Sequence, residues 1–258
     1  MFSWTPDPTN EVAHRPWAIP RSPWLMAQRW TDLLFAHWPI EQSVMRALVP
    51  PSLPLDTFDG SAWLSIASFH LSHLRPHWLP ALPILSAFPE LNVRTYVALN
   101  GKAGVYFFSL DAGSALAVAG ARATYHLPYF KAGMQIRSST DGAIEYSSHR
   151  TDRRGRPAHF RARYRATAPV AYSHSGTLDH WLTERYCLYS TDYAGRVYRA
   201  EIHHHQWPLQ SAEASIEENT MAIAAGLSLP ALEPRLAFSS LLDVVVWAPE
   251  RIGQLPNG

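Results

Sequence analysis

The chain has 258 residues, of which 47% are hydrophobic, and this is enough to bury a large core as one big domain or two smaller ones. A formal net charge of +1 excludes a global field that would attract nucleic acid, and a lone cysteine, Cys187, excludes an internal disulfide. The first residues are polar and contain prolines, and no stretch approaches 18 apolar residues, so we expect neither a signal peptide nor a membrane span. These features predict a soluble, cytoplasmic protein without nucleic-acid or membrane partners.

The first part of the chain passes from an irregular arm to strands. Residues 1–22 predict an arm, because five prolines between positions 6 and 23 block regular structure. Residues 24–38 fit a strand or a helix, and residues 39–51 predict a short helix that ends at a Pro-Pro pair. Asp59-Gly60 then signals a hairpin. The proline-rich apolar loop over residues 72–89 is equally compatible with a lid over a pocket and with a packed connector.

A second hairpin, around Asn100-Gly101, carries the strongest turn signal of the chain. The turn fixes which side chains of the two strands share a face. One face is mostly apolar: Val93, Thr95, Val97, Leu99, Tyr106, Phe108 and Leu110. The other mixes polar and apolar groups: Glu90, Asn92, Arg94, Tyr96, Val105, Phe107 and Ser109. Such a mixture predicts a polar wall of a partly apolar cavity.

The second half continues mainly as strands. We expect an alanine-rich helix up to Tyr125 capped by Asp111 or Ser114, a meander over residues 132–167, a helix begun by Thr177 and strands around Gly195. Residues 215–227 predict a helix closed by a glycine, and residues 236–252 predict a last strand. Strands outnumber helices, so the expected fold is a β-rich α+β fold in a single domain spanning residues 1–258.

The chemistry on offer is restricted by the basic residues, which comprise 20 arginines and only two lysines. Because arginine stays protonated, a side-chain amine nucleophile could come only from Lys102 or Lys131. Lys131 has an apolar setting that would lower its pKa by desolvation, and Arg122 is a candidate for the nearby cation. The alternation of arginines with apolar residues over 159–166 indicates a solvated strand face rather than a nucleic-acid site.

No metal or cofactor is expected. His203, His204 and His205 are adjacent on a predicted strand, so at most two of them can converge. The sequence contains no GxGxxG or P-loop pattern for nucleotide phosphates and no GxSxG nucleophile elbow.

Seven segments of the chain resemble the YqjF-like family, a domain of unknown function: "LLFAHWPI", "LDTFDGSAWL", "FPELNVRTYV", "GVYFFSLDA", "LPYFKAGM", "ERYCLYS" and "WPLQSAEA". The resemblance runs from about residue 14 to residue 252, and the family is grouped with the acetoacetate-decarboxylase-like superfamily. It implies an acetoacetate-decarboxylase-like β-barrel core with a central cavity and a few peripheral helices. On this basis we expect a barrel domain over residues 23–252 behind the irregular arm of residues 1–22.

The resemblance also bears on catalysis. In acetoacetate decarboxylases the catalytic lysine and its partner follow a proline that resembles Pro128, but the next residues here are Tyr129 and Phe130. The decarboxylase lysine pair is therefore absent, although Lys131 shares a strand face with Tyr129. Residues 90–94 resemble the strand that carries an active-site glutamate in those enzymes.

Three functions are compatible with the sequence. The favoured one is a cavity protein that binds a small carboxylate or carbonyl compound, with Arg94 on the anion. The expected ligand-binding residues are Glu90, Asn92, Arg94, Tyr96, Arg122 and Tyr129. The alternatives are a divergent decarboxylase or lyase that uses Lys131 as Schiff-base nucleophile, and a structural or interaction module whose cavity is filled by its own aromatics. The sequence is compatible with a homo-oligomer and does not require one.

Overall fold

The computed structural model describes residues 7–81 and 86–254 and is dominated by strands. The strands are β1 (Met26–Ile40), β2 (Ala62–Pro76), β3 (Phe88–Leu99), β4 (Lys102–Ala112), β5 (Tyr129–Ser138), β6 (Ile144–Arg150), β7 (His159–Ala166), β8 (Cys187–Thr191), β9 (Arg196–His204), β10 (Ala212–Asn219), β11 (Arg235–Val246) and β12 (Glu250–Gln254). The helices are α1 (Gln42–Arg46), α2 (Ala115–Tyr125), α3 (Leu178–Thr183) and α4 (Met221–Ala224), with a 3-10 turn, η1 (Pro8–Asn10), in the N-terminal arm. The β-rich α+β prediction is confirmed.

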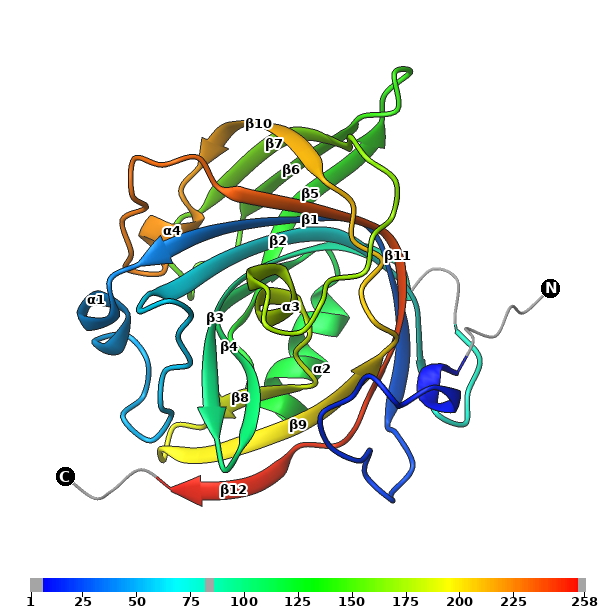
Figure 1. The fold of residues 1–258 in the computed structure, drawn as a ribbon, viewed down its shortest axis with the longest axis vertical. Helices are drawn as coiled ribbons and strands as arrows, with labels where there is room; N and C mark the ends of the chain where they lie inside the picture. Colours follow the sequence, from blue (N-terminus) through cyan, green and yellow to red (C-terminus); the bar gives the residue numbers. More distant parts are fainter. Residues whose placement is uncertain (1–6, 82–85, 255–258) are drawn as a thin grey trace.

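The strands first form a ring. Their pairings run through β4, β3, β2, β1, β11, β9 and β8, and β8 then pairs with β4 in parallel, so the series closes on itself. Figure 1 shows these strands curving around α2 and α3, which lie within the outline of the ring. The inner face of the ring holds one hydrophobic cluster, which includes Leu33, Phe35, Phe69 and Phe107 together with Leu182 of α3.

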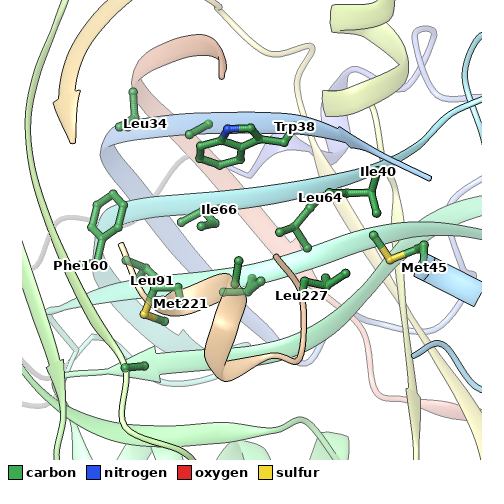
Figure 2. Packing of buried hydrophobic residues seen from close by; sticks show 14 of the residues in the cluster. Leu34, Trp38, Ile40, Met45, Leu64, Ile66, Leu91, Phe160, Met221 and Leu227 are labelled. Atoms are coloured by element: carbon green, nitrogen blue, oxygen red, sulfur yellow. The ribbon is translucent and has the colours of Figure 1, made fainter. Parts of the chain in front are cut away.

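A second sheet, made of β5, β6, β7 and β10, lies across the outer face of the ring (Figure 1). It is continuous with the ring, because β5 pairs with β4 over residues 129–131 before it turns to pair with β6. The outer faces of the ring strands pack against this second sheet and against α1 and α4 in the main hydrophobic core. Figure 2 shows Leu34, Ile66 and Leu91 of the ring near Phe160 of β7.

Strand β1 settles the ambiguity of residues 24–38 in favour of a strand. Leu33 and Phe35 belong to the cluster inside the ring, whereas Leu34 and Ala36 belong to the outer core. Because both faces of the strand are buried, the polar and apolar alternation that identifies a half-exposed strand is missing, and a helix pattern fits the sequence equally well.

The Asn100-Gly101 turn forms as predicted, but the strand parity expected from it holds only as far as a β-bulge. Asn100 and Gly101 have φ angles of 54° and 73°, as a type I′ turn requires. In β4, however, Phe107 pairs with Arg94 and Ser109 pairs with Val93, so Phe108 is an extra residue in a β-bulge. The bulge reverses the parity beyond it: Leu110 lines the inner cavity in place of Ser109, which corrects the predicted faces.

The C-terminal third departs from the predicted elements. The expected helix over residues 215–227 is mostly strand β10, and only Met221–Ala224 is helical, although Gly226 has the positive φ of 87° that ends it. Strand β10 alternates partly buried and exposed side chains and completes the second sheet beside β7. Residues 236–252 form two strands rather than one.

The N-terminal arm is fixed to the ring by buried charges. The guanidinium of Arg15 donates to Glu201 of β9 at 2.5 Å and to the backbone oxygen of Tyr186 at 3.2 Å. Lys102 also donates to Glu201 at 2.5 Å, so one of the two lysines is held in an ion pair. Over the part of the chain that the structure describes, no helix is long and apolar enough to span a bilayer.

Candidate functional site

A cavity of about 480 Å³ lies inside the ring, and we call it the central cavity. Its wall is built from the inner faces of β1, β2, β3 and β4, with α2 along one side. Most wall residues are apolar. The polar and amphipathic wall residues are Gln28, Trp30, Glu90, Asn92, Arg94, Thr124, Tyr125 and Tyr129. Cavities of this volume are the usual size of small-molecule sites.

Strand β3 supplies the polar part of the wall. Glu90, Asn92 and Arg94 are spaced two residues apart, so their side chains project from the same face of the strand. The strand pairs antiparallel with β2, where the partners of these three residues are Phe69, Ala67 and Ser65. All three polar side chains are more than nine-tenths buried, with exposed fractions of 4%, 4% and 8%. They form a polar ladder that runs from Glu90 inward to Arg94.

Glu90 is held in its neutral form. Burial raises the pKa of its carboxyl from 4.5 to about 8, although a hydrogen bond from the Tyr129 hydroxyl at 3.0 Å acts in the opposite direction. Burial and the neighbouring Glu90 also raise the pKa of Tyr129 well above its ordinary value. At neutral pH the pair therefore holds two protons, and the carboxyl can donate one to a ligand oxygen.

Arg94 is a buried cation without a carboxylate partner among residues 7–81 and 86–254. Its guanidinium lies 5.1 Å from the centre of the Phe35 ring, and its Nε makes no hydrogen bond. Burial lowers the pKa of Arg94, and the nearby Tyr96 hydroxyl raises it, but a guanidinium remains charged in proteins. The side-chain oxygen of Asn92 is likewise buried without a partner. An uncompensated charge and an unpaired amide oxygen thus lie on one wall.

Beyond Arg94 the ring is closed by aromatic and basic side chains. The hydroxyl of Tyr96 is 3.3 Å from Nδ1 of His37, and its ring lies 4.7 Å from Trp181 of α3. Burial lowers the pKa of His37 well below its ordinary value, and the charge of Arg94 acts in the same direction. This imidazole is therefore neutral at pH 7. The Tyr96 hydroxyl thus interacts with Arg94, but Tyr96 does not line the central cavity.

Two other predicted site residues lie beside the central cavity rather than on its wall. The side chain of Arg122 donates to the backbone oxygen of Tyr129 at 3.0 Å. Lys131 donates from Nζ to the backbone oxygens of Gly113 and Ala132. The structure thus brings Glu90, Asn92, Arg94 and Tyr129 together around one space and leaves Lys131 and Arg122 outside it.

Some residues of the cavity wall were not predicted from the sequence. The face of α2 that carries Ala117 and Ala121 borders the central cavity, as does Trp30, whose indole nitrogen is buried without a partner. The alanine-rich composition identifies the helix but does not say what it covers, because small residues face solvent and cavities alike. Trp30 lies in the segment where strand and helix could not be separated.

The described part of the chain contains no cluster of His, Cys, Asp or Glu side chains arranged to hold a metal ion. Two of the three consecutive histidines are structural. His203 Nε2 is 3.0 Å from the backbone oxygen of Pro8 in the arm, and His204 Nδ1 is 2.7 Å from the backbone oxygen of His205. Burial lowers the pKa of His203 to about 4 and that of His204 to about 3. Both are neutral core residues at pH 7.

Solved structures with this architecture include enzymes. An enduracididine biosynthesis enzyme, MppR, with HEPES buffer bound, has a TM-score of 0.62 at 11% identity, covering 90% of this chain and 89% of that chain. The acetoacetate decarboxylase of Legionella pneumophila subsp. pneumophila str. Philadelphia 1 has a TM-score of 0.61 at 12% identity, covering 95% of each chain. At such low identity these likenesses show the fold alone, and they confirm the expected acetoacetate-decarboxylase-like core.

Sequence comparison gives the family. The chain is 49% identical over 230 residues to the uncharacterized protein YqjF of Bacillus subtilis (strain 168), which covers 89% of this chain and 93% of that protein. The model of the DUF2071 family, described as "Uncharacterized conserved protein (COG2071)", matches residues 27–243. The protein therefore belongs to the DUF2071 family, together with its YqjF-like relatives.

Proposed function

We propose that this protein binds a small carboxylate-bearing compound in the central cavity, with Arg94 holding the carboxylate. The observation that carries the proposal is the burial of Arg94 on the cavity wall without a carboxylate partner among the described residues. A buried charge costs several kcal/mol unless it is paired. An anionic ligand supplies the missing partner, and the planar guanidinium matches a carboxylate with two parallel hydrogen bonds.

The other rungs of the ladder suit a second oxygen on the ligand. The neutral Glu90 carboxyl, supported by Tyr129, can donate a hydrogen bond to a carbonyl oxygen, and the unpaired oxygen of Asn92 can accept one from a hydroxyl. A small oxo acid combines a carboxylate for Arg94 with a carbonyl oxygen for Glu90. The neighbour MppR has also been solved in complex with pyruvate, which supports an oxo acid as a ligand class for this architecture.

Schiff-base chemistry has less support than binding. An imine needs an amine within reach of the bound carbonyl. In the described chain no lysine lines the central cavity, and Lys131 directs its amine at the carbonyl oxygens of Gly113 and Ala132. We therefore propose a site that binds the ligand and polarises its carbonyl group through Glu90, without a covalent amine intermediate. A volume of about 480 Å³ also argues against a cavity filled by its own aromatics.

The test is ligand-induced thermal stabilisation of wild-type protein, Arg94→Ala, the bulkier Arg94→Met and the control Arg153→Ala, which changes an exposed arginine. The probes are pyruvate, acetoacetate and butyrate. We expect the wild type and the control to be stabilised, and both Arg94 variants to bind about 10- to 150-fold more weakly, the range for a lost charged hydrogen bond. A stabilisation that survives in Arg94→Met would contradict the role of Arg94.

Borohydride with acetoacetate should leave the mass of the wild type unchanged, and an adduct on Lys131 would restore the lyase alternative.

A further inference from the structure

We propose that the physiological ligand is an amphipathic monocarboxylic acid of medium chain length, with its carboxylate at Arg94 and its apolar tail extended along the central cavity toward α2. This inference rests on the proposed function, because it assumes the carboxylate on Arg94. It goes further by naming the shape and polarity of the rest of the ligand. Three properties of the cavity carry it: the separation of polar from apolar wall, the volume and the depth.

Most polar groups of the cavity lie along one side, which strand β3 forms, and the charged guanidinium of Arg94 is at its inner end. Glu90, Asn92 and Arg94 are on β3, and Tyr129 contacts Glu90. Apart from Gln28, Trp30, Thr124 and Tyr125, the remainder of the wall is apolar, and it includes Met26, Leu71, Leu74, Leu116 and Val246. A short, wholly polar acid would leave this apolar surface covered only by water. An aliphatic chain removes it from water, which is favourable by about 25 cal/mol per Å².

The volume is also larger than short oxo acids need. At the share of about 30 Å³ that a water molecule occupies in the liquid, a cavity of about 480 Å³ has room for about 16 non-hydrogen atoms. Pyruvate has six such atoms and acetoacetate has seven, so either would fill less than half of the space. An acid of eight to twelve carbons would fill most of it.

The strand register gives the depth of the central cavity. Arg94 lies opposite Ser65 on β2, and six residues further along β2 the cavity-lining Leu71 lies opposite Phe88. Six residues of strand span about 20 Å. A ligand anchored at Arg94 must therefore be elongated to reach the far wall, and a three- or four-carbon acid stays at the inner end.

Helix α2 provides an opening at the far end. Ala117, Gly120 and Ala121 line the cavity and are spaced three and four residues apart, so they share one helix face. Their small side chains leave room for a chain to pass. The neighbouring Leu116 also lines the cavity yet is 67% exposed, which locates the contact of the cavity with solvent at this helix.

The experiment is calorimetric titration of the full chain at pH 7 with acetate, butyrate, hexanoate and octanoate, with pyruvate for comparison and octan-1-ol as a probe without a carboxylate. We expect Kd to fall about fourfold for each methylene from butyrate to octanoate, the equivalent of about 0.8 kcal/mol per buried CH₂. Octan-1-ol should bind at least tenfold more weakly than octanoate, because it lacks the charge that pairs with Arg94.

Two variants of α2 locate the tail. Ala121→Phe places a ring in the proposed path and should abolish the gain in affinity beyond butyrate or hexanoate. The matched control Ala123→Phe, on an exposed position of the same helix that does not line the cavity, should keep the full chain-length dependence. Short acids that bind as tightly as octanoate, or equal effects of the two variants, would overturn the inference while leaving the proposed function intact. If no acid binds, or if octan-1-ol binds as well as octanoate, the proposed function itself is overturned.

Discussion

At the scale of single residues, the protonated carboxyl of Glu90 has a consequence for stability. Its pKa is about 8 in the folded protein and 4.5 as the ordinary value, which we take for the unfolded chain, and burial is the main cause. Between these two values the folded state holds a proton that the unfolded state has lost. The free energy of unfolding then decreases as pH rises, by about 1.4 kcal/mol per pH unit at most, and this dependence ends above about pH 8.

Glu90→Gln should remove that pH dependence, because the amide imitates the neutral carboxyl and does not titrate. In urea unfolding at pH 5, 6, 7 and 8, we expect the stability of the variant relative to wild type to increase steadily with pH. The exposed control Glu233→Gln should show no such trend. A constant difference between Glu90→Gln and wild type across the range would mean that Glu90 ionises normally in the folded protein.

Sequence reasoning located part of this site by strand parity. The Asn100-Gly101 turn and the two-residue period predicted a cavity-facing row in β3, and Glu90, Asn92 and Arg94 do line the central cavity, although their role in ligand binding stays a prediction. Parity failed to place Lys131, because β5 leaves the ring for the second sheet directly after its pairing with β4. Where a strand changes sheets depends on long-range pairing, and no local pattern encodes it.

At the scale of elements, a buried ion pair joins the ring to the second sheet. Arg150 of β6 donates from Nε and Nη2 to the carboxylate of Asp111 of β4, with a shortest distance of 2.6 Å, and both side chains are at most 3% exposed. Burial raises the pKa of Asp111, and the bonds to Arg150 oppose that change. The pair thus connects the two sheets at the point where β4 and β5 separate.

Removing one partner of this pair should be far more harmful than removing both. Asp111→Ala leaves Arg150 charged, buried and unpaired, and we expect a loss of about 3–5 kcal/mol in the free energy of unfolding. The double variant Asp111→Leu with Arg150→Met should recover most of that loss in urea unfolding. If the double variant is as unstable as Asp111→Ala, the pair contributes more than mutual neutralisation.

The sequence identified most strands but misassigned β10. Residues 215–219 contain three consecutive polar residues followed by Thr220, which fits a capped helix start as well as an edge strand. In the structure β10 pairs with β7, where Glu213 lies opposite Arg165 and the two form an ion pair at 2.6 Å. Cross-strand partners 48 positions apart decided the element, and local propensity could not anticipate them.

At the scale of the whole molecule, the two sheets share one core. Phe160 of β7 is 1% exposed and packs in the same cluster as Leu34, Ile66 and Leu91 of the ring (Figure 2). Two tyrosine hydroxyls also form hydrogen bonds between the sheets. Tyr146 donates to the backbone oxygen of Glu90 at 2.7 Å, and Tyr164 donates to that of Asp32 at 2.8 Å. We therefore predict that residues 7–254 unfold as one cooperative unit, in keeping with the single domain expected from the sequence.

Tryptophan fluorescence can test this, because none of the ten tryptophans lies in residues 129–166 or 212–219, which contain the second sheet. Phe160→Ala should lower the free energy of unfolding by about 3–5 kcal/mol. If the protein is one unit, the urea transition seen by tryptophan fluorescence will shift with that seen by far-ultraviolet circular dichroism. The exposed neighbour Arg161→Ala should change stability by no more than about 0.5 kcal/mol. A fluorescence transition that stays at its wild-type position in Phe160→Ala would show that the ring folds independently of the sheet beside it, and residues 23–252 would then contain two units.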